Sequence, residues 1–218
     1  MQPKIRSRNK STPSFIEAAR RDQLVEAAIA TIAEVGYAKA SFVRIAERAA
    51  ISPGLISYHF STKGELLEQV IVHITTTMDR AMSARAEGAS GYVAALRAMI
   101  EAFVHYCAGH RPEMLALLQL SSNAEDPEVA KELARTQETG LSELEEMFQK
   151  GQEARAFRAF SPRTMAVTLM GALEAVPREL ALRPETDVDA YACELATAFE
   201  LAVQPLPHAP RAKHKKRR

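Results

Sequence analysis

The sequence lacks tryptophan and is poor in aromatic residues, which make up 6% of its 218 residues. Cysteine is nearly absent, and Cys107 and Cys193 are too far apart for a disulfide framework or a metal pair. No stretch approaches the roughly 20 consecutive apolar residues of a membrane-spanning helix. The basic first residues are not followed by the apolar run of a secretion signal. We therefore expect a cytoplasmic protein without disulfides.

Motifs of catalysis and metal binding are also missing. His105 and His110 are five positions apart, which misses the i, i+4 spacing that places two ligands on one helix face. The sequence contains no nucleophile elbow, phosphate loop or dinucleotide fingerprint. We expect no metal, no cofactor and no enzymatic activity.

Hydrophobic residues make up 47% of the chain, and alanine, leucine, glutamate and arginine fill its central stretches. These residues favour helix, because they lose little side-chain freedom there. Apolar periodicity and the placement of glycine and proline predict an all-α protein of about nine helices. Pro177 is expected to kink its helix or end it early. The predicted helices span about 14–35, 53–59, 63–86, 92–108, 112–121, 127–152, 162–182 and 187–203. A further short helix is predicted to begin after Ser41 and to include Glu47 and Arg48.

Charge is unevenly distributed along the chain. Residues 1–14 carry +4 and residues 205–218 carry +6, so a net charge of +1 leaves −9 for the rest. Residues 15–65 are neutral, which places the whole −9 in 66–204. A basic end joined to an acidic body indicates that one end faces a polyanion. The terminal runs are equally compatible with solvated tails, and whether they contact DNA stays open.

Two short helices joined by a tight turn and leaning on a third predict a helix-turn-helix. Ser41 is a candidate N-cap for the first, while Ser52 and Pro53 suit the start of the second. Small residues on the second helix of the pair would let that helix approach the edges of the DNA bases. The expected inner surface comprises Phe42, Ile45, Ala46, Ile56 and Phe60. The expected outer surface comprises Pro53, Gly54, Ser57, Tyr58 and His59.

A wider pattern over about residues 14–67 resembles the DNA-binding signature of the TetR family. It is carried by Gly36-Tyr37, Ser41, Ile45-Ala46, Ala49, Ile51-Ser52, Gly54, Ile56, His59-Phe60, Lys63 and Leu66-Leu67. The stretch 52–60 is further similar to the BetI-like branch, which includes the choline-responsive regulator of the betaine pathway. The resemblance implies a TetR-like fold and a homodimeric repressor of palindromic operator DNA.

The resemblance and side-chain chemistry assign the DNA contacts. Phosphate contacts are expected from Tyr58, His59 and Lys63, with Ser41 and Arg44 beside them. The side of the recognition helix turned to the bases is expected to carry Ser52, Pro53, Gly54, Leu55 and Ser57.

Two departures from the family pattern are visible. Ala50 replaces the usual turn glycine, which predicts either slight strain in the turn or a different backbone dihedral there. Ser57 replaces the usual phosphate-contacting tyrosine, with Tyr58 one position later, so either could make that contact.

The remaining residues should dimerise and sense a ligand. In the family the last two helices form the dimer contact, and their apolar stripes supply the expected interface: Met165, Leu169, Ala172, Val176, Val188, Tyr191, Leu195, Phe199 and Ala202.

Side chains that would line a ligand pocket are Met99, Phe103, Met114, Leu117, Leu118, Met147, Phe148, Met170 and Glu174. Such spacing also describes an ordinary core. Glu101 and Glu174 lie on mainly apolar stripes, so each acid either reaches solvent or pairs with a cation. The acidic body and the resemblance to the choline-responsive branch favour a small apolar ligand, which could be cationic.

The predicted domains are a basic tail (1–13), the helix-turn-helix domain (14–67), a ligand-binding and dimerisation domain (68–204) and a second basic tail (205–218). The leading hypothesis is a repressor that a ligand releases from DNA. A DNA-binding protein without a small-molecule inducer is the alternative that a tightly filled core would favour. A helical enzyme or pure interaction module would show no salt-dependent DNA binding.

Overall fold

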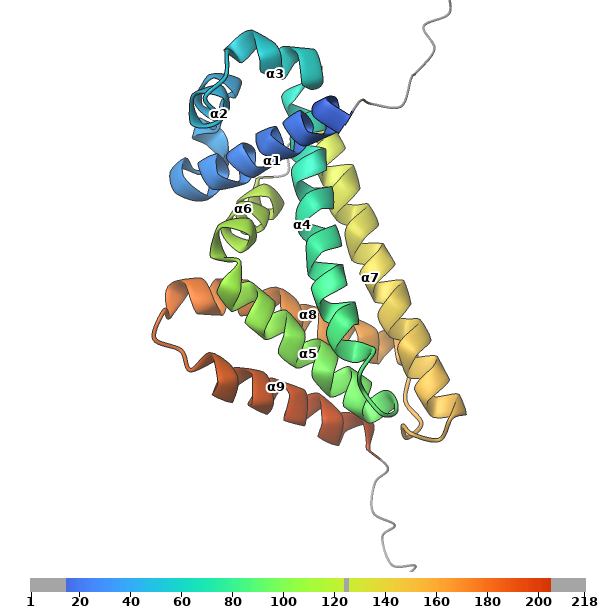
Figure 1. Ribbon diagram of the computed structural model, residues 1–218. Helices are drawn as coiled ribbons and strands as arrows, with labels where there is room; N and C mark the ends of the chain where they lie inside the picture. Colours follow the sequence, from blue (N-terminus) through green and yellow to red (C-terminus); the bar gives the residue numbers. More distant parts are fainter. Residues whose placement is uncertain (1–14, 124–125, 205–218) are drawn as a thin grey trace, which may run out of the picture.

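The computed structural model describes residues 15–123 and 126–204 and is entirely helical over them (Figure 1). Both predicted tails lie outside this range. The helices are α1 (Phe15–Val35), the 3-10 helix η1 (Tyr37–Lys39), α2 (Phe42–Arg48), α3 (Pro53–His59), α4 (Lys63–Ala86), α5 (Tyr92–Gly109), α6 (Arg111–Ser122), α7 (Pro127–Glu153), α8 (Pro162–Leu182) and α9 (Val188–Val203). The predicted all-α fold is confirmed, and only η1 was not expected.

Side-chain caps and prolines start most of these helices where the sequence predicted. Ser41 Oγ accepts from the Arg44 N–H at the start of α2, and Asp187 Oδ1 accepts from the Ala190 N–H at the start of α9. Ser52 occupies the N-cap of α3, but its hydroxyl makes no capping hydrogen bond. Pro53 follows at the first helical position, where its missing N–H costs nothing.

The helix α8 does not end at Pro177 but continues to Leu182, so an early end at this proline is wrong. The ring removes one N–H, which leaves the Leu173 carbonyl without its usual helical donor. The flanking Val176 and Leu180 are buried. Packing of these neighbours outweighs the lost hydrogen bond.

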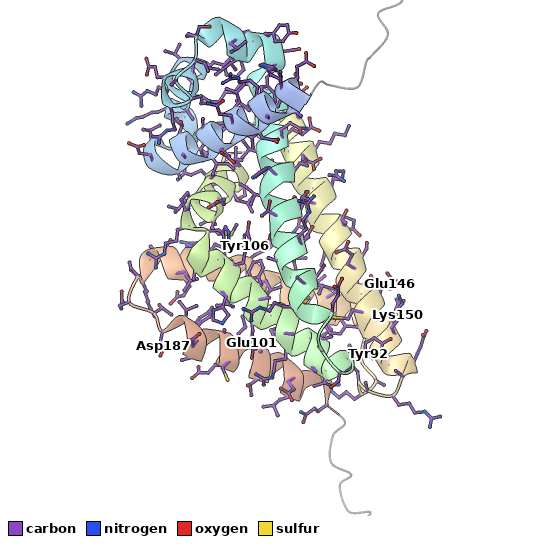
Figure 2. All side chains as sticks on the ribbon, viewed as in Figure 1. Tyr92, Glu101, Tyr106, Glu146, Lys150 and Asp187 are labelled. Atoms are coloured by element: carbon purple, nitrogen blue, oxygen red, sulfur yellow. The ribbon has the colours of Figure 1, made fainter. Side chains whose placement is uncertain are left out.

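α1 lies across the top of α4 and packs against α2, α4 and α6 (Figure 1). Its buried Leu24, Ala28 and Ile32 form the predicted stripe. α4 runs from this end to the opposite end beside α7, so the predicted boundary between residues 67 and 68 falls inside one continuous helix. Figure 2 places Tyr92, at the start of α5, and Lys150, near the end of α7, at the end farthest from α2 and α3.

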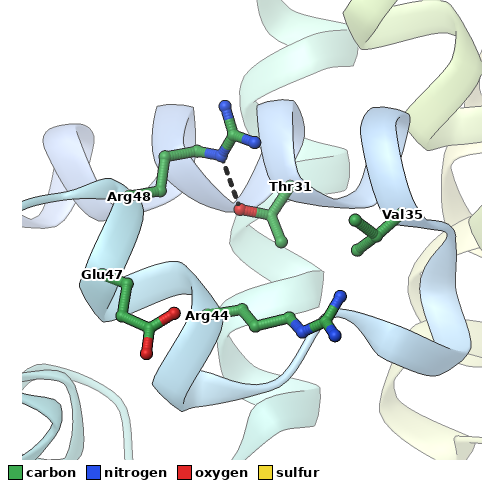
Figure 3. A pocket seen from close by; sticks show the side chains of 5 residues that line it. All are labelled: Thr31, Val35, Arg44, Glu47 and Arg48. Carbon is green, nitrogen blue, oxygen red and sulfur yellow. Dashed lines mark hydrogen bonds between the residues drawn. The ribbon is translucent and has the colours of Figure 1, made fainter.

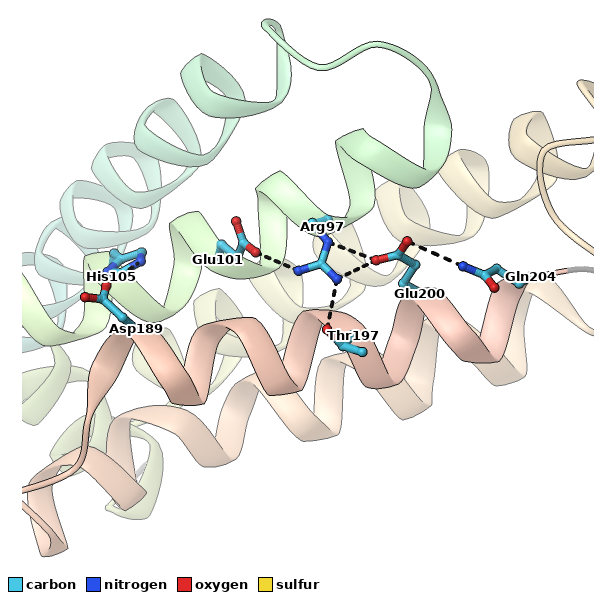
Figure 4. Close-up of polar contacts among 7 residues, drawn as sticks. All are labelled: Arg97, Glu101, His105, Asp189, Thr197, Glu200 and Gln204. Carbon is cyan, nitrogen blue, oxygen red and sulfur yellow. Dashed lines mark hydrogen bonds and ion pairs between the residues drawn. The ribbon is translucent and has the colours of Figure 1, made fainter.

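α5 is the central helix of the second half and packs against α4, α8 and α9. A polar cluster joins it to α9 (Figure 4). Arg97 Nε donates to Glu200 Oε2 at 2.9 Å, and its Nη1 donates to Glu101 Oε1 at 2.9 Å. These carboxylates hold the pKa of Arg97 above its usual value. The guanidinium is therefore a fixed cation that ties α9 to α5.

The turn between α2 and α3 places an alanine in the left-handed region. Ala50 has φ of 53°, and the N–H of the following Ile51 donates to the Ala46 carbonyl at 3.0 Å. This is the Schellman arrangement, in which glycine is the usual residue. The predicted strain at Ala50 is therefore present.

Ala50→Gly is expected to raise the free energy of unfolding by about 0.5–1 kcal/mol. Relief of the left-handed strain exceeds the extra freedom that glycine gives the unfolded chain. Chemical denaturation followed by circular dichroism measures the change. Ala154, which caps α7 with an ordinary φ of −73°, provides the control, since Ala154→Gly should be destabilising. Equal effects of the two substitutions would contradict the prediction.

Candidate nucleic-acid interface

The inner surface of the helix-turn-helix is closed by apolar side chains. Ile45, Ala46, Ile56 and Phe60 are fully buried, and Phe42 is half-buried against the same core. The predicted inner surface is therefore confirmed. Because α2 and α3 are each only seven residues long, this packing fixes their orientation more than their own hydrogen bonds do.

The outward side of α3 carries small or polar side chains. Five of the predicted residues are exposed there: Ser52, Pro53, Gly54, Ser57 and Tyr58. Leu55 and His59 are half-buried at the edges of this surface. An open, low-relief helix face of this kind fits the major groove.

Tyr58 is the most prominent side chain of this surface, with 72% of its area exposed. Its hydroxyl lies 3.4 Å from Glu17 Oε1, and its ring meets that of His59 edge-on at 5.0 Å between centroids. Ser57 is exposed as well, so the structure leaves both candidates for the phosphate contact accessible.

His59 is held by its backbone, because its carbonyl accepts from Arg21 Nη1. Burial, followed by the charge of Arg21, lowers the pKa of the His59 imidazole. In the protein without DNA, both effects disfavour the protonated imidazole.

Lys63, predicted to contact phosphate, has a partner within the protein. Its Nζ donates to the Tyr37 carbonyl at 3.2 Å and lies 4.5 Å from the centre of the Tyr37 ring. Burial lowers the pKa of the Lys63 ammonium, and the carboxylate of Asp126 opposes that shift. A phosphate contact by Lys63 stays a prediction, and it would require the side chain to leave Tyr37.

A shallow groove between α1 and α2 contains Arg44 and Arg48 (Figure 3). Arg48 is occupied: its Nε donates to Thr31 Oγ1 at 3.0 Å, and its Nη2 pairs with Glu34. The side chain of Arg44 has no hydrogen bond or ion pair with any described residue and is exposed. Arg44 is thus available to DNA, as predicted from its place in α2.

Lys39 was missed by the sequence analysis. It ends η1, two positions before the cap of α2, and its exposed ammonium has no partner among residues 15–123 and 126–204. A basic residue just before the N-cap was the available signal. Lys39 and Arg44 are therefore two unpaired cations beside the start of α2.

Most of the predicted ligand residues lie in the apolar core. Phe103, Met114 and Phe148 are buried, and Met99, Leu117, Met147 and Met170 are half-buried against the apolar core. Leu118 is also half-buried. The two most marked hollows of the described residues are surface grooves, one beside α2 and one along α7. Neither groove is lined by any of the predicted ligand residues.

Glu174 is exposed and accepts a hydrogen bond from Gln137 Nε2 at 3.3 Å. Its prediction as a pocket residue is wrong, because its place on α8 turns the carboxylate to solvent, where it keeps its hydration. Glu101 is paired with Arg97.

Part of the predicted dimer interface is also wrong. Leu169 and Val176 are fully buried and Phe199 is 8% exposed, so they belong to the core of the protomer. Met165, Ala172, Val188, Tyr191, Leu195 and Ala202 are half-buried against or beside that core. The buried members of the stripes face the protomer core, where α8 and α9 pack against α5, and a role of the half-buried members in a dimer stays a prediction.

Exposed apolar residues on the same two helices were missed. We call this set the outer α8–α9 face; it comprises Val167, Gly171, Ala175 and Leu182 on α8, and Cys193, Ala198 and Leu201 on α9, all exposed. Val167, Leu182 and Leu201 expose 51%, 68% and 63% of their areas.

None of the described helices is long and apolar enough to cross a membrane. Within the described ranges, no three His, Cys, Asp or Glu side chains are grouped so that they could hold a metal ion.

Residues 24–70 match the family described as "Bacterial regulatory proteins, tetR family". Residues 90–178 match "Tetracyclin repressor-like, C-terminal domain". The chain belongs to the TetR family. Its relatives are regulatory proteins rather than enzymes, and both halves of this TetR chain carry the resemblance.

Curated relatives of this TetR chain resemble its N-terminal part. It is 44% identical over 70 residues to the HTH-type transcriptional regulator BetI 2 of Chromohalobacter salexigens, covering 32% of this chain and 34% of that protein. It is 42% identical over 66 residues to BetI of Pectobacterium carotovorum, covering 30% and 34%. The chain thus matches about a third of the length of these relatives.

Solved structures share the whole fold. The fatty acid degradation regulator FadR from Bacillus halodurans gives a TM-score of 0.74 at 20% identity, with 86% of this chain and 95% of that chain covered. FadR from Bacillus subtilis, solved with stearoyl-CoA, gives 0.74 at 18% identity, with 84% and 99% covered. At these identities the likeness shows the TetR fold alone.

Proposed function

We propose that this protein is a cytoplasmic transcriptional repressor that binds palindromic operator DNA as a homodimer. The observation that carries the proposal is the outward side of α3, whose small and polar residues stay exposed while its inner side is locked in the core. The unpaired cations Lys39 and Arg44 beside α2 supply positive charge for the phosphate backbone. The family match to residues 24–70 supports the same role.

The outer α8–α9 face supports self-association. Three large apolar side chains exposed on α8 and α9 are costly in water, and such exposure is typical of interaction surfaces. Gly171 lies among them, and a Cβ added there would meet no atom within 4 Å. A second copy could therefore approach α8 closely. Pairing of these faces would form a four-helix interface and present two copies of α3 to half-sites about 34–36 Å apart.

Release from DNA would follow from an apolar ligand among α5, α6, α7 and α8. Met99, Met114, Met147 and Met170 contribute to this region, and methionine adapts its shape more readily than branched residues do. Ligand entry would repack them and shift α4, which carries the helix-turn-helix. The case for a cationic ligand loses its support, because Glu174 is exposed and Glu101 already pairs with Arg97.

A regulator without a small-molecule inducer is the second candidate. The packing of most predicted ligand residues into the apolar core favours it. Operator binding titrated with ligands separates the candidates: a ligand that binds the protein and weakens the complex with DNA selects the first.

The decisive experiment uses Gly54, whose place on α3 does not require glycine. Its φ is not positive, and a Cβ added there would meet no atom within 4 Å. Gly54→Ala should therefore raise the free energy of unfolding by about 0.5–1 kcal/mol. It should also weaken operator binding about tenfold, equivalent to about 1.4 kcal/mol, because the methyl group stands where the helix meets the bases.

Fluorescence anisotropy on DNA flanking the gene and on a scrambled duplex, across a salt series, measures both specificity and phosphate contact. Gly109→Ala is the matched control, since a Cβ at the end of α5 also meets nothing within 4 Å. Equal, weak binding of the wild type to both duplexes would refute the proposed function for the DNA tested. Unchanged operator affinity of Gly54→Ala would remove α3 from the interface.

A further inference from the structure

Two carboxylates from the second half of the chain cover the N-terminal end of α4. Thr62 Oγ1 donates to Glu128 Oε2 at 3.1 Å, across 66 positions of sequence. A Cβ added to Gly64 would lie 2.3 Å from Glu128 Oε2 and 2.9 Å from each carboxylate oxygen of Asp126. A side chain at position 64 would push both acids away, so glycine permits the contact.

Asp126 and Glu128 are held in place by the helix that they begin. Asp126 Oδ1 caps α7 by accepting from the Glu128 N–H at 2.9 Å and from the Val129 N–H at 3.4 Å. α7 then runs along α4 to the far end of the molecule (Figure 1). The contact therefore connects the start of α4 to a helix of the regulatory half.

These acids lie where DNA phosphate is expected. The N-terminus of a helix carries partial positive charge, and Lys63 adds a full charge in its first turn. The charge of Asp126 acts on Lys63, as the opposing effect on the pKa of that ammonium shows. A phosphate approaching Thr62 and Lys63 would meet like charges on Asp126 and Glu128, and the two kinds of anion would compete.

We propose that Asp126 and Glu128, clasped onto Thr62 and Gly64, lower the affinity of the protein for DNA and separate from α4 when it takes up phosphate. This inference rests on the proposed function and specifies how its DNA-binding surface is regulated. In this proposal, a movement of α7 along α4 strengthens or weakens the contact of Asp126 and Glu128 with the start of α4, the acidic clasp. The affinity for DNA then changes without any change in α3.

The test removes both charges and keeps the shapes, with the variant Asp126→Asn/Glu128→Gln. Its affinity for operator DNA should rise about three- to tenfold at low salt, and the gain should shrink as salt screens the charges. Fluorescence anisotropy measures it on the operator and on a scrambled duplex. The control is Glu146→Gln/Glu153→Gln, which changes net charge equally at the far end of α7 and should leave affinity nearly unchanged.

A thermal readout separates regulation from structural support. Carboxylates near the start of α4 stabilise it, so the clasp variant should melt about 1–3 °C lower while it binds DNA more tightly. If the contact were merely structural, its removal would lower both the melting temperature and the affinity for DNA. Affinity equal to or below that of the wild type on both duplexes overturns the proposal. If the wild type does not prefer the operator, the proposed function fails, yet a gain by the variant on both duplexes still upholds the clasp.

Discussion

Replacing Gly151 with alanine is expected to lower the free energy of unfolding by about 2–3 kcal/mol. A Cβ at this position of α7 would lie 2.2 Å from Cδ2 and 2.3 Å from Cε2 of Phe157. The ring cannot retreat freely, because Phe157 is buried with Phe148 at 5.9 Å and Tyr92 at 6.2 Å between ring centroids. The gain of up to about 1 kcal/mol in helix propensity is smaller than this overpacking.

Gly140→Ala is the matched control, since it makes the same change in the same helix. A Cβ there would lie 2.9 Å from Cε of Met170, the free end of a flexible side chain. We expect a change within about 0.5 kcal/mol, because Met170 can turn aside. Urea unfolding followed by circular dichroism compares the two. A Gly151→Ala protein as stable as the wild type would show that the loop after α7 yields easily.

The double substitution Val167→Asp/Leu201→Asp is expected to convert the proposed homodimer to a monomer of about 24 kDa and to weaken operator binding about 10²–10⁴-fold. Each carboxylate would be buried in the apolar outer α8–α9 face and would repel its symmetry mate. A monomer binds one half-site and loses the benefit of tethering the second. Sedimentation velocity measures the mass, and anisotropy measures binding.

Leu115→Asp on α6 controls for placing a charge at an exposed leucine, since Leu115 is 37% exposed and lies outside the outer α8–α9 face. It should leave both mass and operator affinity nearly unchanged. A double variant that remains dimeric would place the interface elsewhere. A wild type that sediments as a monomer without DNA would refute the homodimer itself.

The helix boundaries could be predicted because their signals are local. Ser41, Asp126 and Ser161 each precede a helix as a cap, and prolines open α3, α7 and α8. The inner surface of the helix-turn-helix could be predicted as well, because the spacing of apolar residues along two short helices determines which side chains face each other. The positive φ of Ala50 was predictable because one residue departed from a well-marked family pattern.

The two sides of α8 and α9 could not be assigned from periodicity. A stripe such as Leu169 and Val176 shows which residues share a face, but the face could turn to α5 or to a second copy. The structure shows that these residues turn inward and leaves Val167 and Leu201 outside. Likewise the partners of Lys63 and Glu174 are Tyr37 and Gln137, which are distant in sequence, and no local signal points to such pairs.

The link between α5 and α9 has a consequence for how the chain folds during synthesis. Arg97 and Glu200 are 103 positions apart, and α9 is the last helix that the structure describes. The side of α5 that faces α9 therefore stays uncovered until residues 188–203 have left the ribosome, while α4 and α8 can pack against α5 earlier. Contacts between residues so far apart in sequence slow folding. They also leave an intermediate with exposed apolar surface, which is prone to aggregate. The helices of the helix-turn-helix, α1 to α3, end at His59. The DNA-binding part can therefore fold before the helices of the second half have been synthesised.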